Sequence, residues 1–167
     1  MRKQTKNLVR GAIIAALYVV LTHMQNLLLP GSATWAVQLR LSEALCVLCF
    51  FTPAAAHGLA VGCLLFNLTF AAALPADFIV GTLASWLSGL TMYRLRNRKL
   101  RGVPVLGLLM PAIWNAVLVG GELAFFIGGG FWFNAAAVFL GEAIVLLTFG
   151  WVLYLVICRR RPGLWLA

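Results

Sequence analysis

Long apolar runs follow one another along almost the whole chain, separated by short polar breaks or by breaks that contain glycine and proline. About 20 consecutive apolar residues are what an α-helix needs to cross a bilayer. With 63% hydrophobic and 10% charged residues and a mean hydropathy of +0.98, the composition leaves no room for a soluble domain. We therefore predict an all-α integral membrane protein with a single domain over residues 1–167.

The breaks divide the chain into six predicted transmembrane helices. The second has a short strictly apolar part, so we expect its outer end to contact protein or water rather than lipid. The first is expected to be a retained helix, because its apolar run is long enough to span and no clear small-residue cleavage site follows. The predicted ranges are about 8–29, from the 35–40 region to 52, 54–73, 77–93, 103–127 and 133–158.

The basic residues orient these helices. With six crossings, the amino-terminal flank, the loop "RLRNRKLR" at 94–101 and the tail at 159–161 all fall on one side of the membrane. An excess of lysine and arginine marks the cytoplasmic side. We therefore predict a multi-pass protein of the cell membrane with both termini in the cytoplasm. The net charge of +9 reflects topology rather than nucleic-acid binding, and Arg40 alone is left for the outer side.

The chain has four acidic residues, and the predicted topology places all of them in the outer half of the membrane: Glu43, Asp77, Glu122 and Glu142. Carboxylates at that depth are costly unless they face a partner or a water-filled cavity, so they are candidates for a functional site. Together with Arg40 they predict an acidic pocket that opens outward.

Each candidate also has a structural alternative. Arg40 and Glu43 are three residues apart on one helix, so a local ion pair is the simplest alternative. Yet the stretch "VQLRLSE" before the apolar run contains more polar residues than one ion pair at the membrane surface requires, which favours a ligand site. Glu142 lies in "VFLGEAIVLL" without a local partner, which favours function more strongly.

The remaining polar candidates are more evenly balanced. Asp77 heads an apolar run and either caps its helix or contacts a ligand. Glu122 follows "GG" near a helix end, where it either reaches water or faces the pocket. Asn115 lies seven residues before Glu122 and so on the same side of the helix. For Asn115 and for Asn67, hydrogen bonds between helices are as plausible as ligand contact.

Other motifs exclude several kinds of chemistry. Cys46 and Cys49 have CxxC spacing but lie in an apolar run without nearby histidines, so buried thiols are expected rather than a metal or redox site. There is no GxxxxGK[ST] loop for ATP and no constellation of catalytic residues, so we expect neither an enzyme nor a bound cofactor. Ala12 and Ala16 have the spacing that allows another helix to approach closely.

Six blocks of the sequence resemble the successive blocks of the QueT family of queuosine-precursor transporters, over about residues 8–150. In chain order they are "AALYVVLT", "VQLRLSEAL", "VGCLLFNL", "DFIVGTLAS", "IWNAVLVGGEL" and "LGEAIVLL". The combination of "RLSEAL", "DFIVG" and "LGEA" is more specific than any one block. The charged loop and the tail are particular to this chain.

The resemblance implies a six-helix substrate-binding subunit (S-component) of an energy-coupling factor importer that captures a 7-deazaguanine base from outside. A transmembrane coupling protein would dock on Ala12 and Ala16, and two ATPase subunits would use ATP. A carboxylate accepts two adjacent N–H donors of a guanine-like edge, and an aminomethyl group needs a second acid or an aromatic face. Glu142 and Glu43 are the choices for these two roles. The expected substrate-binding residues are Trp35, Arg40, Glu43, Asn67, Asp77, Asn115, Glu122 and Glu142.

Three alternatives remain open from the residues alone. The first keeps the S-component but changes the ligand to another small cationic or heterocyclic solute, such as a vitamin. The second is a proton-coupled carrier that works alone and uses the intramembrane acids as a relay. The third, a small membrane enzyme with His23 and the acids as general acid and base, has the least support because no nucleophile constellation accompanies them.

Overall fold

The computed structural model describes residues 2–30, 39–70 and 74–160, and the regular elements in these ranges are all helices. They form six consecutive helical segments, in agreement with the predicted number. The segments are α1 (Lys3–Leu28), η1 (Leu41–Phe50), α2 (Ala54–Thr69), α3 (Asp77–Leu95), α4 (Val105–Leu108) with α5 (Met110–Phe126), and α6 (Phe131–Val145), which continues through η2 (Leu146–Gly150) into α7 (Trp151–Arg160).

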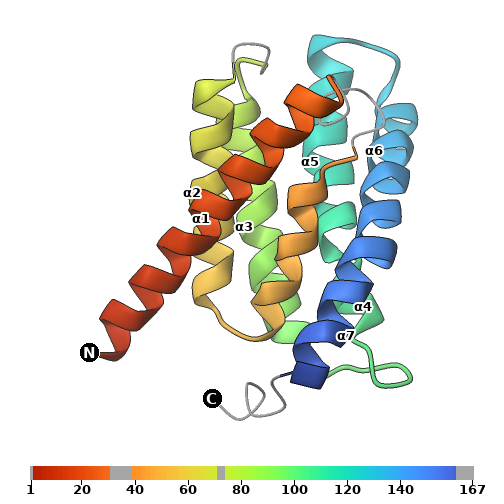
Figure 1. Cartoon of the computed structure of the whole chain (residues 1–167). Coiled ribbons are helices and arrows are strands. Elements are labelled where there is room, and N and C mark those ends of the chain that lie inside the picture. Colours follow the sequence, from red (N-terminus) through yellow and green to blue (C-terminus); the bar gives the residue numbers. More distant parts are fainter. Residues whose placement is uncertain (1, 31–38, 71–73, 161–167) are drawn as a thin grey trace.

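The segments run up and down the long axis of a bundle (Figure 1). The start of α1, the end of α7 and the connection between α3 and α4 lie at one end, which we call the terminal end. The end of α2, the start of α3 and the connection from α5 to α6 lie at the other, which we call the site end. The basic clusters therefore gather at the terminal end, as the predicted topology requires.

Three of the helical segments are long and apolar enough to cross a membrane: Lys3–Leu28, Val105–Phe126 and Phe131–Arg160. Leu41–Phe50 and Ala54–Thr69 are apolar but shorter. The six-helix bundle is thus observed, whereas six membrane crossings and cytoplasmic termini stay predictions.

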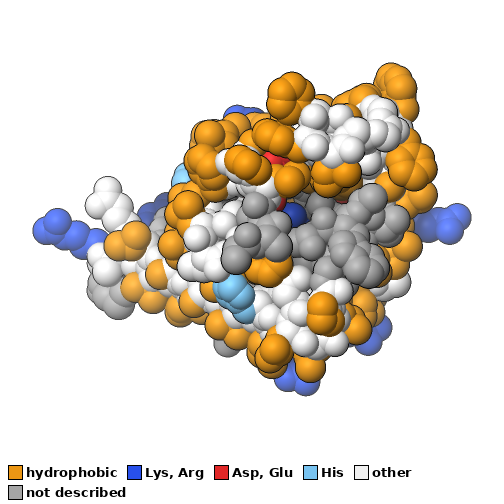
Figure 2. Space-filling model, turned by 90° about the horizontal axis from the view of Figure 1, so that it is seen from above, with side chains coloured by type: hydrophobic (Ala, Val, Ile, Leu, Met, Phe, Trp, Pro, Cys, Tyr) orange, Lys and Arg blue, Asp and Glu red, His pale blue; other side chains and the backbone are white. Residues whose placement is uncertain are grey.

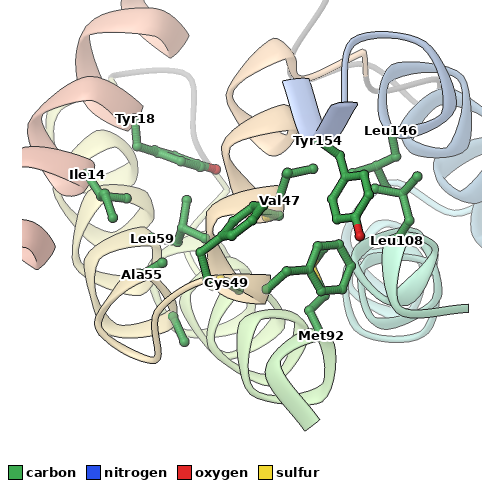
Figure 3. Close-up of a cluster of buried hydrophobic side chains, with 14 of the residues drawn as sticks. Ile14, Tyr18, Val47, Cys49, Ala55, Leu59, Met92, Leu108, Leu146 and Tyr154 are labelled. Carbon is green, nitrogen blue, oxygen red and sulfur yellow. The ribbon is translucent and has the colours of Figure 1, made fainter. Parts of the chain in front are cut away.

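The second segment differs from the expected one. It is a 3₁₀-helix of ten residues that begins at Leu41, and the predicted start at 35 lies outside the described residues. A short segment of this kind does not have to face lipid, because η1 lies in the middle of the bundle. The main hydrophobic core surrounds it: Figure 3 shows Val47 and Cys49 between Tyr18 of α1, Leu59 of α2, Met92 of α3 and Tyr154 of α7.

Boundaries also differ at the third and fifth segments. The third was expected to reach 73, but α2 ends at Thr69, and 71–73 lie outside the described residues. The fifth was expected as one helix from 103, but the chain forms a short α4 and then α5, with Leu109 between them. Pro104 and Pro111 lie at the starts of these two helices, where proline favours initiation over continuation.

Two close helix contacts rely on glycine. A Cβ atom on Gly58 of α2 would lie 2.5 Å from the carbonyl oxygen of Gly11 in α1. A Cβ atom on Gly120 of α5 would lie 2.7 Å from the Cα of Ala135 in α6. Small residues let helix backbones approach in membranes, where packing rather than the hydrophobic effect holds helices together. These contacts fix α1 against α2, and α5 against α6.

Candidate binding site

The start of η1 holds the charged pair Arg40 and Glu43, and both residues are buried. Arg40 is 3% exposed and Glu43 is fully buried. Arg40 is the N-cap of η1 and has extended backbone, and Glu43 lies in the first turn. The backbone N–H of Glu43 donates to the carbonyl of Arg40 at 3.0 Å, which forms the first turn of η1.

The carboxylate of Glu43 is hydrogen-bonded by its own chain. The Tyr18 hydroxyl donates to Oε1 at 3.0 Å, and the Cys46 thiol donates to Oε2 at 3.0 Å. Tyr18 is itself fully buried on α1. A hydrogen bond to an ionised acceptor is stronger than one between neutral groups, so these two bonds hold the orientation of the carboxylate.

Two more residues of α1 fasten the start of η1. The Thr22 hydroxyl lies 2.8 Å from the Ser42 hydroxyl. The Gln25 side chain donates to the carbonyl of Leu39 and accepts the N–H of Leu41 at 2.8 Å. Gln25 therefore satisfies backbone groups on both sides of Arg40.

The sequence analysis missed this polar stripe of α1. Tyr18, Thr22 and Gln25 have the spacing i, i+4, i+7, so they share one helix face. A polar stripe of that period in an otherwise apolar run was the signal that could have identified it. We call Tyr18, Thr22, Gln25, Ser42 and Glu43 the α1–η1 network.

The opposite wall of the site is formed by α5 and α6, and its polar groups lack partners. Glu142 is fully buried, Asn115 is 1% exposed and Glu122 is 6% exposed. Both carboxylate oxygens of Glu142, both of Glu122 and Nδ2 of Asn115 have no hydrogen-bond partner among the described residues. Leaving a buried polar group unsatisfied costs about 1–3 kcal/mol, and more when it is charged. Such groups are explained when a ligand supplies the missing partners.

The charges of the two walls face one another. Glu142 interacts electrostatically with Glu43 and Arg40, and Asn115 is close to its carboxylate. Glu122 interacts with Asp77 and with Arg40. Figure 2 looks down on the site end and shows acidic and basic atoms near its middle, within a rim of hydrophobic side chains. The cluster therefore suits a ligand that brings N–H donors or a positive charge.

The depth of these groups follows from helix geometry. Asn115 lies seven residues below Glu122 on α5, which is about 10 Å along the helix. We call Asn115 and Glu142 the floor of the site, and Glu122 and Asp77, which lie nearer the site end, its mouth. A π-helical segment, η2, begins four residues after Glu142, and π-turns often occur near functional sites.

Asn67 and Asp77 have structural contacts instead. Asn67 Nδ2 donates to the backbone carbonyl of Asp77 at 2.8 Å and joins α2 to the start of α3. The carboxylate of Asp77 accepts the N–H of Leu74 at 2.6 Å and so stabilises the turn before α3. Asn67 thus has an interhelical hydrogen bond, whereas Asp77 does not cap α3, whose N-cap is Ala76 without a side-chain hydrogen bond. Asp77 lies next to Glu122, and ligand contact by Asn67 or Asp77 stays a prediction.

The remaining predicted residues are Trp35, Ala12 and Ala16. Trp35 lies outside the described residues. Ala12 and Ala16 are exposed on α1, toward the terminal end. Ala12 lines a groove of about 570 Å³ between α1 and α2, together with Gly11 and Gly58. The two alanines are thus open to contact by another helix.

The comparisons with known proteins place the chain in a family. Residues 8–159 match the model of the QueT transporter family, which is nearly the whole chain. No curated protein and no solved structure matches. The match agrees with the membrane-length helices and with the six blocks from which the resemblance was inferred. The chain therefore belongs to the QueT transporter family and is a membrane transporter protein.

Proposed function

We propose that the chain is the S-component of an energy-coupling factor importer and captures a queuosine precursor, a 7-deazaguanine base, from outside the cell. The observation that supports this most is the set of buried groups on α5 and α6 without hydrogen-bond partners in the described ranges. A solute-binding site needs a few polar groups placed so that they can bond to the solute.

The floor of the site suits the hydrogen-bonding edge of the base. Glu142 offers two acceptor oxygens, which match two adjacent N–H donors of a guanine-like edge. Asn115 Nδ2 adds a donor beside it, suited to a carbonyl oxygen on the same edge. Arg40 balances part of the negative charge, and the α1–η1 network holds Arg40 and Glu43 in place.

The mouth of the site suits a cation. Glu122 and Asp77 lie next to each other there, and an aminomethyl group would place a positive charge between them. Glu43 was the second acid expected to contact the ligand, but Tyr18 and Cys46 already bond both of its oxygens. Glu122 is therefore the better choice for the cation, with Glu43 as a supporting acid.

Uptake would depend on partner subunits. The sequence has no P-loop motif, so ATP would be used by two ATPase subunits, joined to this chain by a transmembrane coupling protein. The exposed Ala12 and Ala16 with the adjacent groove on α1 suit close docking by a helix of that protein. In this arrangement the terminal end faces the cytoplasm of a cell membrane.

The first test is ligand binding to the purified chain in mild detergent. Calorimetric titration would compare the nitrile precursor, the aminomethyl precursor, guanine and a cationic vitamin such as thiamine. We expect a precursor to bind most tightly, and Glu142→Gln to weaken it at least about 100-fold, or about 3 kcal/mol. Glu43→Gln is the matched control and should weaken binding less.

The outcomes separate the alternatives. Tight binding of the vitamin alone would favour an S-component with a different ligand. No binding of any precursor to a folded sample would refute the queuosine assignment. Uptake by cells that lack the ATPase and coupling subunits would favour a carrier that works alone.

A further inference from the structure

A second groove lies on the other side of α1, at the terminal end. Its volume is about 470 Å³ and its walls come from α1, the end of η1 and α7. Figure 1 shows the first half of α1 inclined away from the rest of the bundle. The volume falls in the range of about 300–1,000 Å³ that is usual for small-ligand sites.

An arginine stands at the terminal end of each wall of this groove. Arg10 precedes Ile13, Ile14 and Leu17, which follow at i+3, i+4 and i+7 on one face of α1. Arg160 follows Val156 and Ile157, at i−4 and i−3 on one face of α7. Each wall is thus an apolar stripe with one cation at its end.

Both arginines are exposed, and neither side chain has a hydrogen bond or ion pair with another described residue. Thr52, with a hydroxyl group, also lines the groove. The groove between α1 and α2 differs in its lining. Its polar lining residues are Gln4, Asn7 and His57, and it has neither lysine nor arginine. Of these two grooves, the one between α1 and α7 combines an apolar interior with two cations at one end.

We propose that this groove binds an anionic phospholipid, with the phosphate between Arg10 and Arg160 and an acyl chain along the apolar walls. The two parts of the lipid match the two parts of the groove. The phosphate can accept hydrogen bonds from the arginines, and the acyl chain can pack against walls that have almost no polar group. From Arg10 to Leu17 the wall extends about 10 Å along α1, directed from the terminal end toward the middle of the membrane. Basic sites between transmembrane helices are known positions for anionic headgroups.

The test is lipid binding to the purified full-length chain, measured by native mass spectrometry. The probes are phosphatidylglycerol and phosphatidylcholine with identical acyl chains. We expect phosphatidylglycerol to bind about tenfold more tightly or better, since two arginines contact its headgroup. Equal affinity for the two lipids would overturn the proposal.

Two double variants locate the site. Arg10→Gln with Arg160→Gln should lower the affinity for phosphatidylglycerol to the value for phosphatidylcholine. Arg94→Gln with Arg98→Gln removes the same charge from exposed positions at the same end of the bundle, and should leave the preference intact. If both pairs lower the affinity equally, the preference is a general effect of surface charge and the groove is not the site.

Two further measurements examine the acyl chain. Leu17→Trp keeps both arginines but fills the groove, and it should weaken both lipids severalfold while the thermal unfolding midpoint is maintained. Glycerol phosphate, which lacks acyl chains, should bind far more weakly than phosphatidylglycerol. Equal binding of glycerol phosphate would identify a site for free phosphate instead, and binding unaffected by Leu17→Trp would exclude the groove as the position of the chain. All of these measurements are independent of the transported solute.

Discussion

The two walls of the candidate site contain similar buried carboxylates, but those carboxylates have hydrogen-bond partners in one wall and none among the described residues in the other. On the α1–η1 side, the carboxylate of Glu43 is bonded by Tyr18 and Cys46, and Thr22 bonds to Ser42. On the α5–α6 side, the carboxylate of Glu142 is just as buried, yet its oxygens have no hydrogen bond to any described residue. Burial alone therefore does not distinguish a supporting carboxylate from one available to a ligand.

The difference indicates that the α1–η1 wall contributes mainly to stability and the α5–α6 wall mainly to ligand binding. A bonded buried carboxylate contributes to the folded state, and removing its bonds leaves other polar groups unsatisfied. A buried carboxylate without partners is a cost in the empty protein, and a ligand that supplies N–H donors recovers that cost. Substitutions in the two walls should accordingly affect two different measurements.

Among the effects on stability, the largest expected difference is between Glu43→Gln and Glu142→Gln. Glu43→Gln should lower the free energy of unfolding by about 2 kcal/mol, because the neutral amide cannot accept both the Tyr18 and the Cys46 hydrogen bonds. Denaturation in mild detergent with increasing dodecyl sulfate would measure it. Glu142→Gln is the same chemical change on the other wall and should leave stability unchanged or raised. Equal destabilisation by the two variants would remove the distinction between the walls.

The next effect is in binding at the mouth. Glu122→Gln should weaken the aminomethyl precursor about tenfold, or about 1.4 kcal/mol, because the ligand cation loses a charged partner. The uncharged nitrile precursor should lose much less. Titration of both precursors against the wild type and this variant gives the loss of affinity for each. If the nitrile precursor is weakened as much, Glu122 does not contact the cation.

A smaller loss of stability is expected from Tyr18→Phe. The change removes the hydroxyl that donates to Glu43 and leaves the ring in the core, so we expect a loss of about 1 kcal/mol, within the range for hydrogen bonds between membrane helices. Combined with Glu43→Gln, the loss should be less than the sum of the two, because both variants break one bond. If the two losses of stability were fully additive, the hydrogen bond between Tyr18 and Glu43 would contribute nothing to stability.

The smallest expected effect is that of Thr22→Val, at about 0.6 kcal/mol. Valine has nearly the shape of threonine but cannot bond to Ser42. Thr82→Val is the control, because the Thr82 hydroxyl donates to the carbonyl of Phe78 in its own helix and has no bond to another helix among the described residues. Thermal unfolding of both variants in the same detergent would compare them. A loss as large for Thr82→Val would show that the interhelical bond does not stabilise the bundle.

Hydrophobic patterning predicted most of the fold. The runs between polar breaks located the six helical segments, because an apolar run of that length has few alternatives to a helix in a membrane. They did not predict that the second segment is a 3₁₀-helix. Its geometry depends on contacts with all the helices around it, and the residues Leu41–Phe50 contain no local signal for it.

The candidate site was predictable in part. The rarity of acids in an apolar chain selected Glu43, Glu122 and Glu142 at once, because every buried charge in a membrane requires a reason. The sequence did not show which of these acids would bond to the ligand and which would support the fold. Tyr18 is 25 residues from Glu43 along the chain, so the bond that makes Glu43 a supporting residue exists only after α1 packs beside η1.

The sequence by itself determined a helical membrane protein, the resemblance to the QueT family and the short list of acids, because these follow from composition and from local order along the chain. Only the tertiary structure decided which acids have partners, which face of α1 holds η1, and that Arg10 and Arg160 line one groove. Those properties arise from contacts between segments distant in the sequence, and a buried polar group is satisfied or unsatisfied according to what packs against it.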